Sequence, residues 1–194
     1  MEEKSEKSNK ELIRKAFLRK RKLLGPNTFD HLNIMILDQV TSAFEFLPGT
    51  MAHVFLPILK NKEVNTWPII NYLVSQQVSV CVSKSSLEQN VMINYEYSSN
   101  THIVENRWGI PEPQGGTEVN PLSIDYVFLP LVIFDRNGGR IGYGKGYYDR
   151  FLGACKVNVV KIGLSLAPPV DELPVEPHDI PLDFCVTPRK TYQF

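Results

Sequence analysis

The chain has 194 residues, of which 43% are hydrophobic and 22% are charged. This composition is typical of one globular domain that builds its core without disulfides or a structural metal. The longest apolar run, residues 126–134, falls far short of the roughly 20 residues that span a bilayer, which argues against a membrane protein. Residues 1–24 hold nine Lys or Arg against four Glu, whereas the whole chain has 21 basic and 21 acidic residues. A basic N-terminal helix can therefore bind an anion or the acidic body, but the whole-chain charge does not indicate a nucleic-acid-binding protein.

Residues 1–8 are polar, and we expect them to be frayed or disordered beside a single domain that covers residues 9–194. From Asn9 onward, apolar residues recur at helical spacing until Gly25-Pro26 ends the helix. A second helix is predicted from Thr28 to Phe46. The first helix is expected to dock through an apolar stripe formed by Leu12, Ile13, Ala16 and Phe17.

Strands and helices alternate along the rest of the chain. The predicted strands are 51–58, 78–82, 91–97, 124–134, 157–164 and 182–186, and the predicted helices are 67–76 and 147–154. The near-continuous apolar run 124–134 predicts a central strand buried on both faces, with Pro130 at a bulge or strand end. The Gly- and Pro-rich segment 106–120 predicts an ordered loop or a mobile flap. This order predicts an α/β fold: a single-domain three-layer α/β/α sandwich with a mostly parallel central sheet.

Three cysteines, Cys81, Cys155 and Cys185, lie far apart and form no C-x-x-C pair. The spacing argues against a zinc knuckle, a thioredoxin-like site and a disulfide scaffold. We interpret them as small buried hydrophobic residues in a protein of a reducing, cytoplasmic compartment.

Five of the twelve glycines fall within residues 138–146, directly after the predicted central strand and before a helix. Glycines allow the backbone N–H groups to form a concave anion site, and the following helix adds its positive end. Arg140 and Lys145 supply positive charge for phosphate oxygens. Gly139, Gly144 and Lys145 have the spacing of a Walker P-loop, but Gly146 stands where the magnesium-binding Ser or Thr would be. We therefore predict a phosphate-binding loop that is not of the Walker type.

A longer pattern surrounds this loop: Pro130, Phe134, Asp135, Gly138, Arg140, Gly142, Gly144, Gly146, Tyr147, Tyr148 and Asp149. It resembles the signature of the 5-formyltetrahydrofolate cyclo-ligase family, also called methenyltetrahydrofolate synthetases. Three weaker similarities occur in the order of the family: Lys10 with Arg14, residues 63–66 after Phe55-Leu56, and His178, Asp179, Asp183, Thr187 and Pro188. Two residues, Leu59 and Lys60, extend the stretch before Glu63 relative to the family pattern.

The resemblance implies an enzyme that converts 5-formyltetrahydrofolate to 5,10-methenyltetrahydrofolate, with ATP as co-substrate and Mg²⁺ as cofactor. It also implies a domain similar to the ribose-5-phosphate isomerase and CoA-transferase folds. The implied ATP contacts are Lys10, Arg14, Arg140, Ile141, Gly142, Tyr143, Gly144, Lys145, Gly146, Tyr147 and Tyr148. The implied folate contacts are Leu56, Glu63, Tyr143, Gly144, Lys145, Gly146 and Tyr147. Lys145 and Arg140 are the implied catalytic groups, and Asp149 and Asp183 the implied magnesium ligands.

The residues alone leave other interpretations open. Lys10 and Arg14 also fit a solvated basic face, and Glu63 fits an ordinary surface position. Tyr147 and Tyr148 also fit helix-packing aromatics, and His53 fits a core histidine. Two other functions compete with the cyclo-ligase: a sugar-phosphate isomerase or CoA-transferase relative, and an RNA- or phosphate-binding module built on the basic helix. We expect a monomer that binds neither nucleic acid nor membrane.

Overall fold

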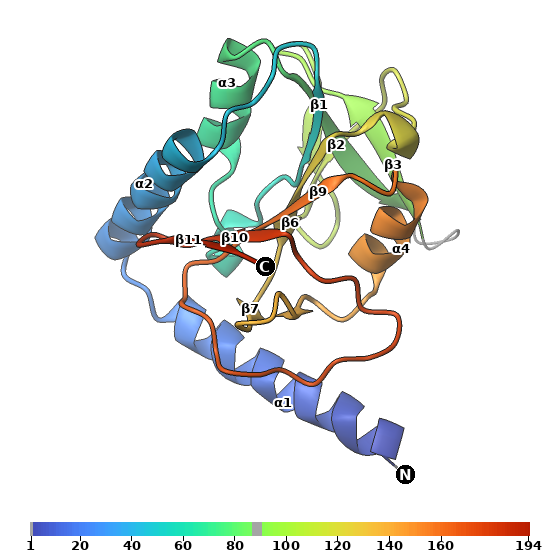
Figure 1. Cartoon of the computed structure of the whole chain (residues 1–194). Helices are drawn as coiled ribbons and strands as arrows, with labels where there is room; N and C mark the ends of the chain where they lie inside the picture. Colours follow the sequence, from blue (N-terminus) through green and yellow to red (C-terminus); the bar gives the residue numbers. More distant parts are fainter. Residues whose placement is uncertain (1, 87–90) are drawn as a thin grey trace.

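Seven strands form one central sheet in the order β11-β10-β9-β6-β1-β2-β3 (Figure 1). The structure is a computed structural model that describes residues 2–86 and 91–194, with side chains from residue 9 onward. The strands of this sheet are β1 (Met51–Val54), β2 (Ser79–Ser86), β3 (Val91–Glu96), β6 (Tyr126–Pro130), β9 (Val160–Leu164), β10 (Phe184–Val186) and β11 (Thr191–Gln193). The five inner strands are parallel, and only β3 and β11 pair antiparallel at the two edges. This confirms the mostly parallel sheet.

Helices cover both faces of the sheet, which confirms the three-layer sandwich. The helices α2 (Pro26–Ala43) and α3 (Trp67–Ser75) bury Ile36, Val40 and Ile70 on one face. The helix α4 (Tyr147–Ala154) buries Phe151 and Leu152 on the other. Smaller elements complete the chain: the pair β4 (Ile103–Glu105) and β5 (Pro111–Pro113), and the 3-10 turns η1 (Leu59–Asn61) and η2 (Pro121–Ser123).

The predicted strand 124–134 is central but shorter than expected. Val127, Phe128 and Leu129 of β6 are fully buried, as a central strand requires. The ladder with β9 ends at Pro130, after which the chain leaves the sheet. Residues Ile133–Phe134 form β7, which pairs antiparallel with β8 (Arg140–Ile141) in a separate hairpin. Proline has no backbone N–H to continue the ladder, so the strand ends there.

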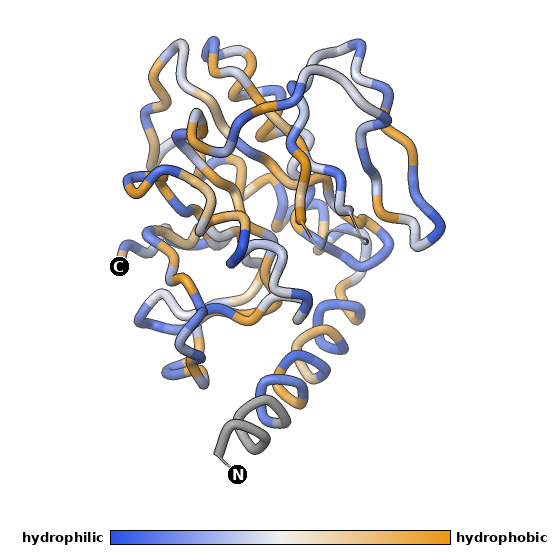
Figure 2. The backbone as a smooth tube through the Cα atoms, turned by 90° about the vertical axis from the view of Figure 1, so that its right-hand side faces the viewer, coloured by the Kyte–Doolittle hydropathy of each residue, from blue (hydrophilic) through white to orange (hydrophobic). Residues whose placement is uncertain are grey.

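The first helix, α1, lies along this hairpin rather than on either face of the sheet (Figure 1). It covers Glu2–Lys22, so it begins before the predicted start at Asn9. Ile13 and Phe17 pack against a small core formed by Ile133, Ile141 and Leu173. The predicted docking stripe was wrong at Leu12, which is 65% exposed, and at Ala16, which is also exposed. Ile13 and Phe17 are four residues apart and share the docked face, whereas Leu12 and Ala16 share a neighbouring face that points to solvent. Apolar and polar bands alternate along this helix in Figure 2.

Other sequence predictions have clear outcomes. All three cysteines are free and buried, as expected. The segment 106–120 contains the short strand β5, so it is not a loop throughout. Among the described residues, no helix is long and apolar enough to cross a membrane.

Asp135 organises the hairpin turn that leads to the glycine-rich loop. Its buried carboxylate accepts hydrogen bonds from the backbone N–H groups of Asn137 (2.9 Å), Gly139 (2.8 Å) and Leu173 (3.0 Å). The third bond ties the hairpin to the segment between β9 and β10. The carboxylate thus fixes two segments that are distant in sequence.

Asp135→Asn should lower the free energy of unfolding by about 2–4 kcal/mol. The shape is kept, but charge-assisted bonds are lost and an amide N–H₂ is turned against backbone N–H groups. Urea unfolding measures the loss. The matched control is Asp171→Asn, since the Asp171 side chain is 95% exposed and pairs with the exposed Arg136. This control should change stability little. Equal, small effects in both variants would contradict a structural role for Asp135.

Candidate active site at the glycine-rich loop

The loop between β8 and α4 lies on the surface with its basic side chain toward solvent. Gly144 and Gly146 have φ angles of +84° and +66°, which side chains other than glycine rarely adopt. Lys145 lies between them and is exposed, and its Nζ has no partner among the side chains that the structure describes. A free ammonium beside two left-handed glycines has the properties expected of a phosphate-binding loop.

Arg14 connects α1 to this loop. Its Nε donates a 2.7 Å hydrogen bond to the carbonyl oxygen of Gly142. Its guanidinium also lies against Gly144, since a Cβ built there would come within 3.0 Å of Arg14 Cζ. The sequence prediction that the basic helix reaches the loop is therefore confirmed for Arg14.

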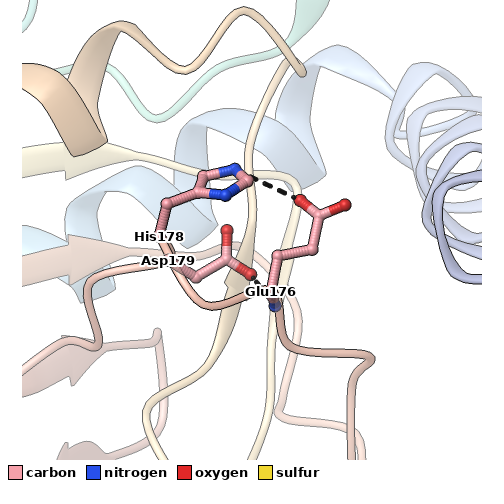
Figure 3. Close-up of side chains that lie close together, drawn as sticks. All are labelled: Glu176, His178 and Asp179. Carbon is pink, nitrogen blue, oxygen red and sulfur yellow. Dashed lines mark hydrogen bonds and ion pairs between the residues drawn. The ribbon is translucent and has the colours of Figure 1, made fainter. Parts of the chain in front are cut away.

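Lys10 lies one turn earlier but does not face solvent. It is 7% exposed, and its Nζ pairs with Glu176 (3.0 Å) and Asp179 (2.5 Å). Both carboxylates come from the segment between β9 and β10, where His178 also lies 3.4 Å from Glu176 (Figure 3). The interpretation as a solvated basic face was wrong for Lys10, whose charge is neutralised within the fold.

Arg140 and Asp149 form a half-buried pair beside the same segment. The guanidinium donates to Asp149 Oδ1 at 2.7 Å and also to the carbonyl oxygen of Ile180. The backbone N–H of Ile180 donates to Asp149 Oδ1 at 3.3 Å. Residues 176–180 are thus fixed against the first turn of α4. Asp149 Oδ2 has no protein partner among the described residues.

Asp183 has a different set of partners. Its Oδ2 accepts from the backbone N–H of Lys161 (2.7 Å) and lies 2.8 Å from Lys161 Nζ. The structure gives Asp183 and Asp149 no common partner. Asp179 is connected to Asp149 more directly, because the next residue, Ile180, donates its backbone N–H to Asp149. Asp179, which belongs to the weak C-terminal similarity, was not among the site residues that the sequence predicted.

Glu63 is a buried carboxylate, which makes its interpretation as a surface residue wrong. It is 4% exposed, and its Oε2 accepts a 2.7 Å hydrogen bond from the backbone N–H of Ile58. Burial raises the pKa of Glu63, while that N–H, the Tyr143 hydroxyl and the Arg21 charge oppose the rise. Leu56 is also buried, on the other side of the η1 turn that contains Leu59 and Lys60.

The two tyrosines after the loop differ in environment. Tyr148 packs edge-on against His53, with 5.8 Å between ring centroids, and against Phe151 at 6.3 Å. Tyr147 is half-buried beneath the Arg150 guanidinium, 5.3 Å from its ring centroid. The interpretation as a packing aromatic is therefore confirmed for Tyr148.

His53 is a core histidine, as one interpretation expected. Its Nε2 lies 2.8 Å from the Ser83 hydroxyl, and burial lowers its pKa to about 3. The imidazole is therefore neutral near pH 7 and supplies no charge to the loop.

Fold and site together define a class: an α/β protein with a non-Walker glycine-rich loop, clamped by a basic helix and close to a buried carboxylate. A family model described as the 5-formyltetrahydrofolate cyclo-ligase family matches residues 6–188. The chain belongs to this family.

Two curated relatives and one solved structure align with this chain over most of their length. The 5-formyltetrahydrofolate cyclo-ligase of Escherichia coli K12 is 34% identical over 161 residues, which cover 79% of this chain and 88% of the relative. A probable cyclo-ligase of Schizosaccharomyces pombe is 28% identical over 183 residues, covering 86% and 89%. The solved structure of Aquifex aeolicus 5,10-methenyltetrahydrofolate synthetase superposes with a TM-score of 0.80 at 30% identity, covering 95% of this chain and 92% of that one.

Gly144→Ala should lower the free energy of unfolding by about 1–2 kcal/mol, because alanine is strained at positive φ. The added methyl group would also press on the Arg14 guanidinium. Gly142→Ala is the matched control, since a Cβ there meets nothing within 4 Å and its φ is not positive. Chemical unfolding of both variants tests the prediction, and equal stability would contradict it.

Proposed function

We propose that this chain is an ATP-dependent cyclo-ligase that converts 5-formyltetrahydrofolate to 5,10-methenyltetrahydrofolate and releases ADP and phosphate. The observation that carries the proposal is the family match over residues 6–188. It is supported by a loop suited to phosphate and a buried carboxylate that Tyr143 connects to it. The same match argues against a sugar-phosphate isomerase or CoA-transferase.

The chemistry activates a formamide. The formyl oxygen attacks the γ-phosphorus of ATP, the bond to the ADP oxygen breaks, and the oxygen becomes a phosphate leaving group. The neighbouring folate N–H nitrogen then attacks the formyl carbon and loses its proton to the phosphate group, the carbon–oxygen bond breaks, and inorganic phosphate departs as the ring closes. Such phosphoryl transfer depends on positioning and charge neutralisation more than on a protein nucleophile.

ATP is assigned to the glycine-rich loop and the arginine face of α1. Lys145 and Arg140 are proposed to stabilise the transferring phosphoryl group, with the backbone N–H groups of residues 140–148 around it. Lys145 is exposed and its Nζ has no partner among the residues that the structure describes, which supports this assignment. Arg14 already contacts the loop, which supports a nucleotide contact. Lys10 would have to exchange at least one of its carboxylates for a phosphate oxygen.

Folate is assigned to the side of the loop that faces Glu63. Leu56 and Glu63 would bind and orient it, and residues 143–147 would face both substrates. A buried carboxylate has a high affinity for the N–H groups of a polar ring, because water does not compete for it. Glu63 is therefore proposed to orient the folate and not to act as a nucleophile.

Asp149 is the carboxylate whose donors fit a magnesium ion. Arg140 and Ile180 orient one of its oxygens and leave the other without a protein partner among the described residues. Magnesium is commonly bound by one or two carboxylates together with substrate phosphates, and it would neutralise charge on ATP. Asp179 and Asp183 are each paired with a lysine, but only Asp179 directly precedes Ile180, whose N–H bonds Asp149, so we propose Asp179 before Asp183 as a second carboxylate.

We propose that the protein binds no nucleic acid. Lys10, Arg14 and Arg21 contact the body of the protein, and from residue 9 onward the exposed cations of the helix are Lys15, Arg19, Lys20 and Lys22. We propose a monomer in the cytoplasm. A basic surface for RNA would need the first three charges free as well, with binding that weakens steeply as salt rises.

An absorbance assay for methenyl-folate formation, with and without ATP, tests the proposed function. Product should form only with ATP, and ADP should be released only when the formyl-folate is present. ADP release without folate, or product formation without ATP, would contradict the cyclo-ligase.

Lys145→Ala should lower kcat by roughly two orders of magnitude, the effect of losing one preorganised charge on a transition state. Because the side chain is exposed and unpartnered, the thermal midpoint should hardly change. Steady-state kinetics and thermal unfolding of the same preparation measure both. Near-wild-type turnover would remove Lys145 from the catalytic groups, and a collapsed midpoint would make it structural.

Asp149→Asn should raise the magnesium concentration that gives half-maximal rate by at least tenfold, because a neutral amide binds a hard cation poorly. The variant also weakens the pair with Arg140, so rates are measured well below its thermal midpoint. Asp179→Asn and Asp183→Asn are compared in the same titration. An unshifted magnesium curve for Asp149→Asn would reject the metal role, and a shift for Asp183→Asn alone would reverse the preference for Asp179.

A further inference from the structure

Arg21, in the last turn of α1, lies outside every motif on which the proposed function rests. Its Nη2 donates a 2.5 Å hydrogen bond to the Tyr143 hydroxyl, and its Nη1 donates to the carbonyl oxygen of Leu131 at 3.3 Å. The guanidinium carbon is 5.7 Å from the centroid of the Tyr143 ring. Arg21 therefore binds two places at once: Tyr143, at the centre of the glycine-rich loop, and Leu131, where the chain leaves β6.

Tyr143 passes this contact on to Glu63. The Tyr143 hydroxyl and the Glu63 carboxylate influence each other: the tyrosine opposes the rise of the Glu63 pKa, and Glu63 raises the pKa of Tyr143. Arginine can only donate, so the Tyr143 oxygen is the acceptor toward Arg21, and its single hydrogen is left for the Glu63 carboxylate. Chemistry thus fixes the direction of the bond from Arg21 to Tyr143, and it leaves the Tyr143 hydrogen available to the Glu63 carboxylate.

The ionised state of Glu63 depends on few groups. The backbone N–H of Ile58 donates to the carboxylate at 2.7 Å, the Tyr143 hydroxyl opposes the rise of its pKa, and its charge in turn raises the pKa of the Tyr148 phenol. Arg21 is the cation that opposes the effect of burial on the Glu63 pKa. Arg21 has no carboxylate ion-pair partner among the described residues, and its buried Nε has no hydrogen-bond partner there. Its charge is thus compensated mainly through Tyr143 and Glu63.

We propose that Arg21 is a positioning residue of the cyclo-ligase, which acts through Tyr143 to hold the Glu63 carboxylate ionised and oriented for the formyl-folate. This rests on the proposed function, since it deepens the role assigned to Glu63. Tyr143 belongs to the loop assigned to ATP, whereas Glu63 belongs to the folate side. The Arg21–Tyr143–Glu63 chain is therefore the link between the two halves of the site.

The first experiment measures the dissociation constant of 5-formyltetrahydrofolate without ATP by calorimetry between pH 5 and 9. Arg21→Met removes the charge and keeps a side chain of similar length. Arg21→Lys keeps the charge but loses the two guanidinium nitrogens that bond Tyr143 and Leu131. Tyr143→Phe removes the linking hydroxyl. Arg19→Met is the matched control, because Arg19 is exposed on the same helix.

For Arg21→Met, the dissociation constant at pH 7 should rise about tenfold, in line with the loss of a charge-assisted hydrogen bond. The pH below which binding fails should also rise. Burial raises the pKa of Glu63, and the carboxylate becomes protonated as pH falls through that pKa. Removing the nearby Arg21 cation raises the pKa further, so protonation then occurs at higher pH. Arg21→Lys should restore part of the pH profile. Arg21→Met should have little further effect in a Tyr143→Phe background, because both changes break the same chain.

The second experiment follows Glu63 itself in the substrate-free protein. The carboxyl carbon of Glu63 is assigned by its loss in Glu63→Gln and titrated by carbon NMR in wild type and Arg21→Met. A higher pKa in Arg21→Met supports the link whether or not the protein turns over folate. An unchanged pKa overturns the proposal, as does an equal loss of ATP and folate binding with an unshifted pH profile. Failure of wild-type turnover with the NMR shift intact would instead contradict the proposed function.

Discussion

The site depends on one long-range contact, the hydrogen bond from Arg14 to the Gly142 carbonyl, across 128 residues of sequence. A loop with glycines at three of five positions, 142–146, has little intrinsic preference for one conformation. The ordering free energy must come from outside the loop, and α1 supplies it. The helix docks through Ile13 and Phe17 on the hairpin that leads into the loop, so its arginines reach loop atoms at fixed positions.

Charge pairing makes this docking specific. An apolar contact of two side chains alone would allow the helix to slide or rotate on the hairpin. Lys10 binds Glu176 and Asp179, and Arg21 binds Tyr143, at opposite ends of the docked segment. The Lys10 side chain is 8% exposed, so salt screens its pairs little, and displacing it is unfavourable because an unpaired buried charge is costly. Part of the positive charge of the N-terminal segment, that of Lys10, Arg14 and Arg21, thus fixes the helix on the body of the protein.

Local signals predicted a large part of the fold. The helix predicted at residues 147–154 has the bounds of α4, and the apolar run containing Val127, Phe128 and Leu129 is the central strand. The two-residue strands β7 and β8 carry no periodicity, so only the pairing partner defines them. Within the site, the sequence predicted the glycine-rich loop and placed Arg14 at the same ligand as that loop, in agreement with the contact between Arg14 and Gly142. The burial of Glu63 and the carboxylate partners of Lys10 were not predicted, because both arise from segments that meet only in the folded chain.

The cations around the loop divide into two kinds. Lys10, Arg14 and Arg140 each donate hydrogen bonds to protein acceptors, and those bonds fix their positions. Among the described residues, Lys145 differs because its ammonium is exposed and unpaired. A fixed cation can orient a phosphate with little reorganisation, but part of its charge is already compensated. An unpaired cation keeps its full charge for the ligand and gains its first strong partner when phosphate arrives. This division suits a reaction in which ATP must be positioned before charge moves onto the transferred group.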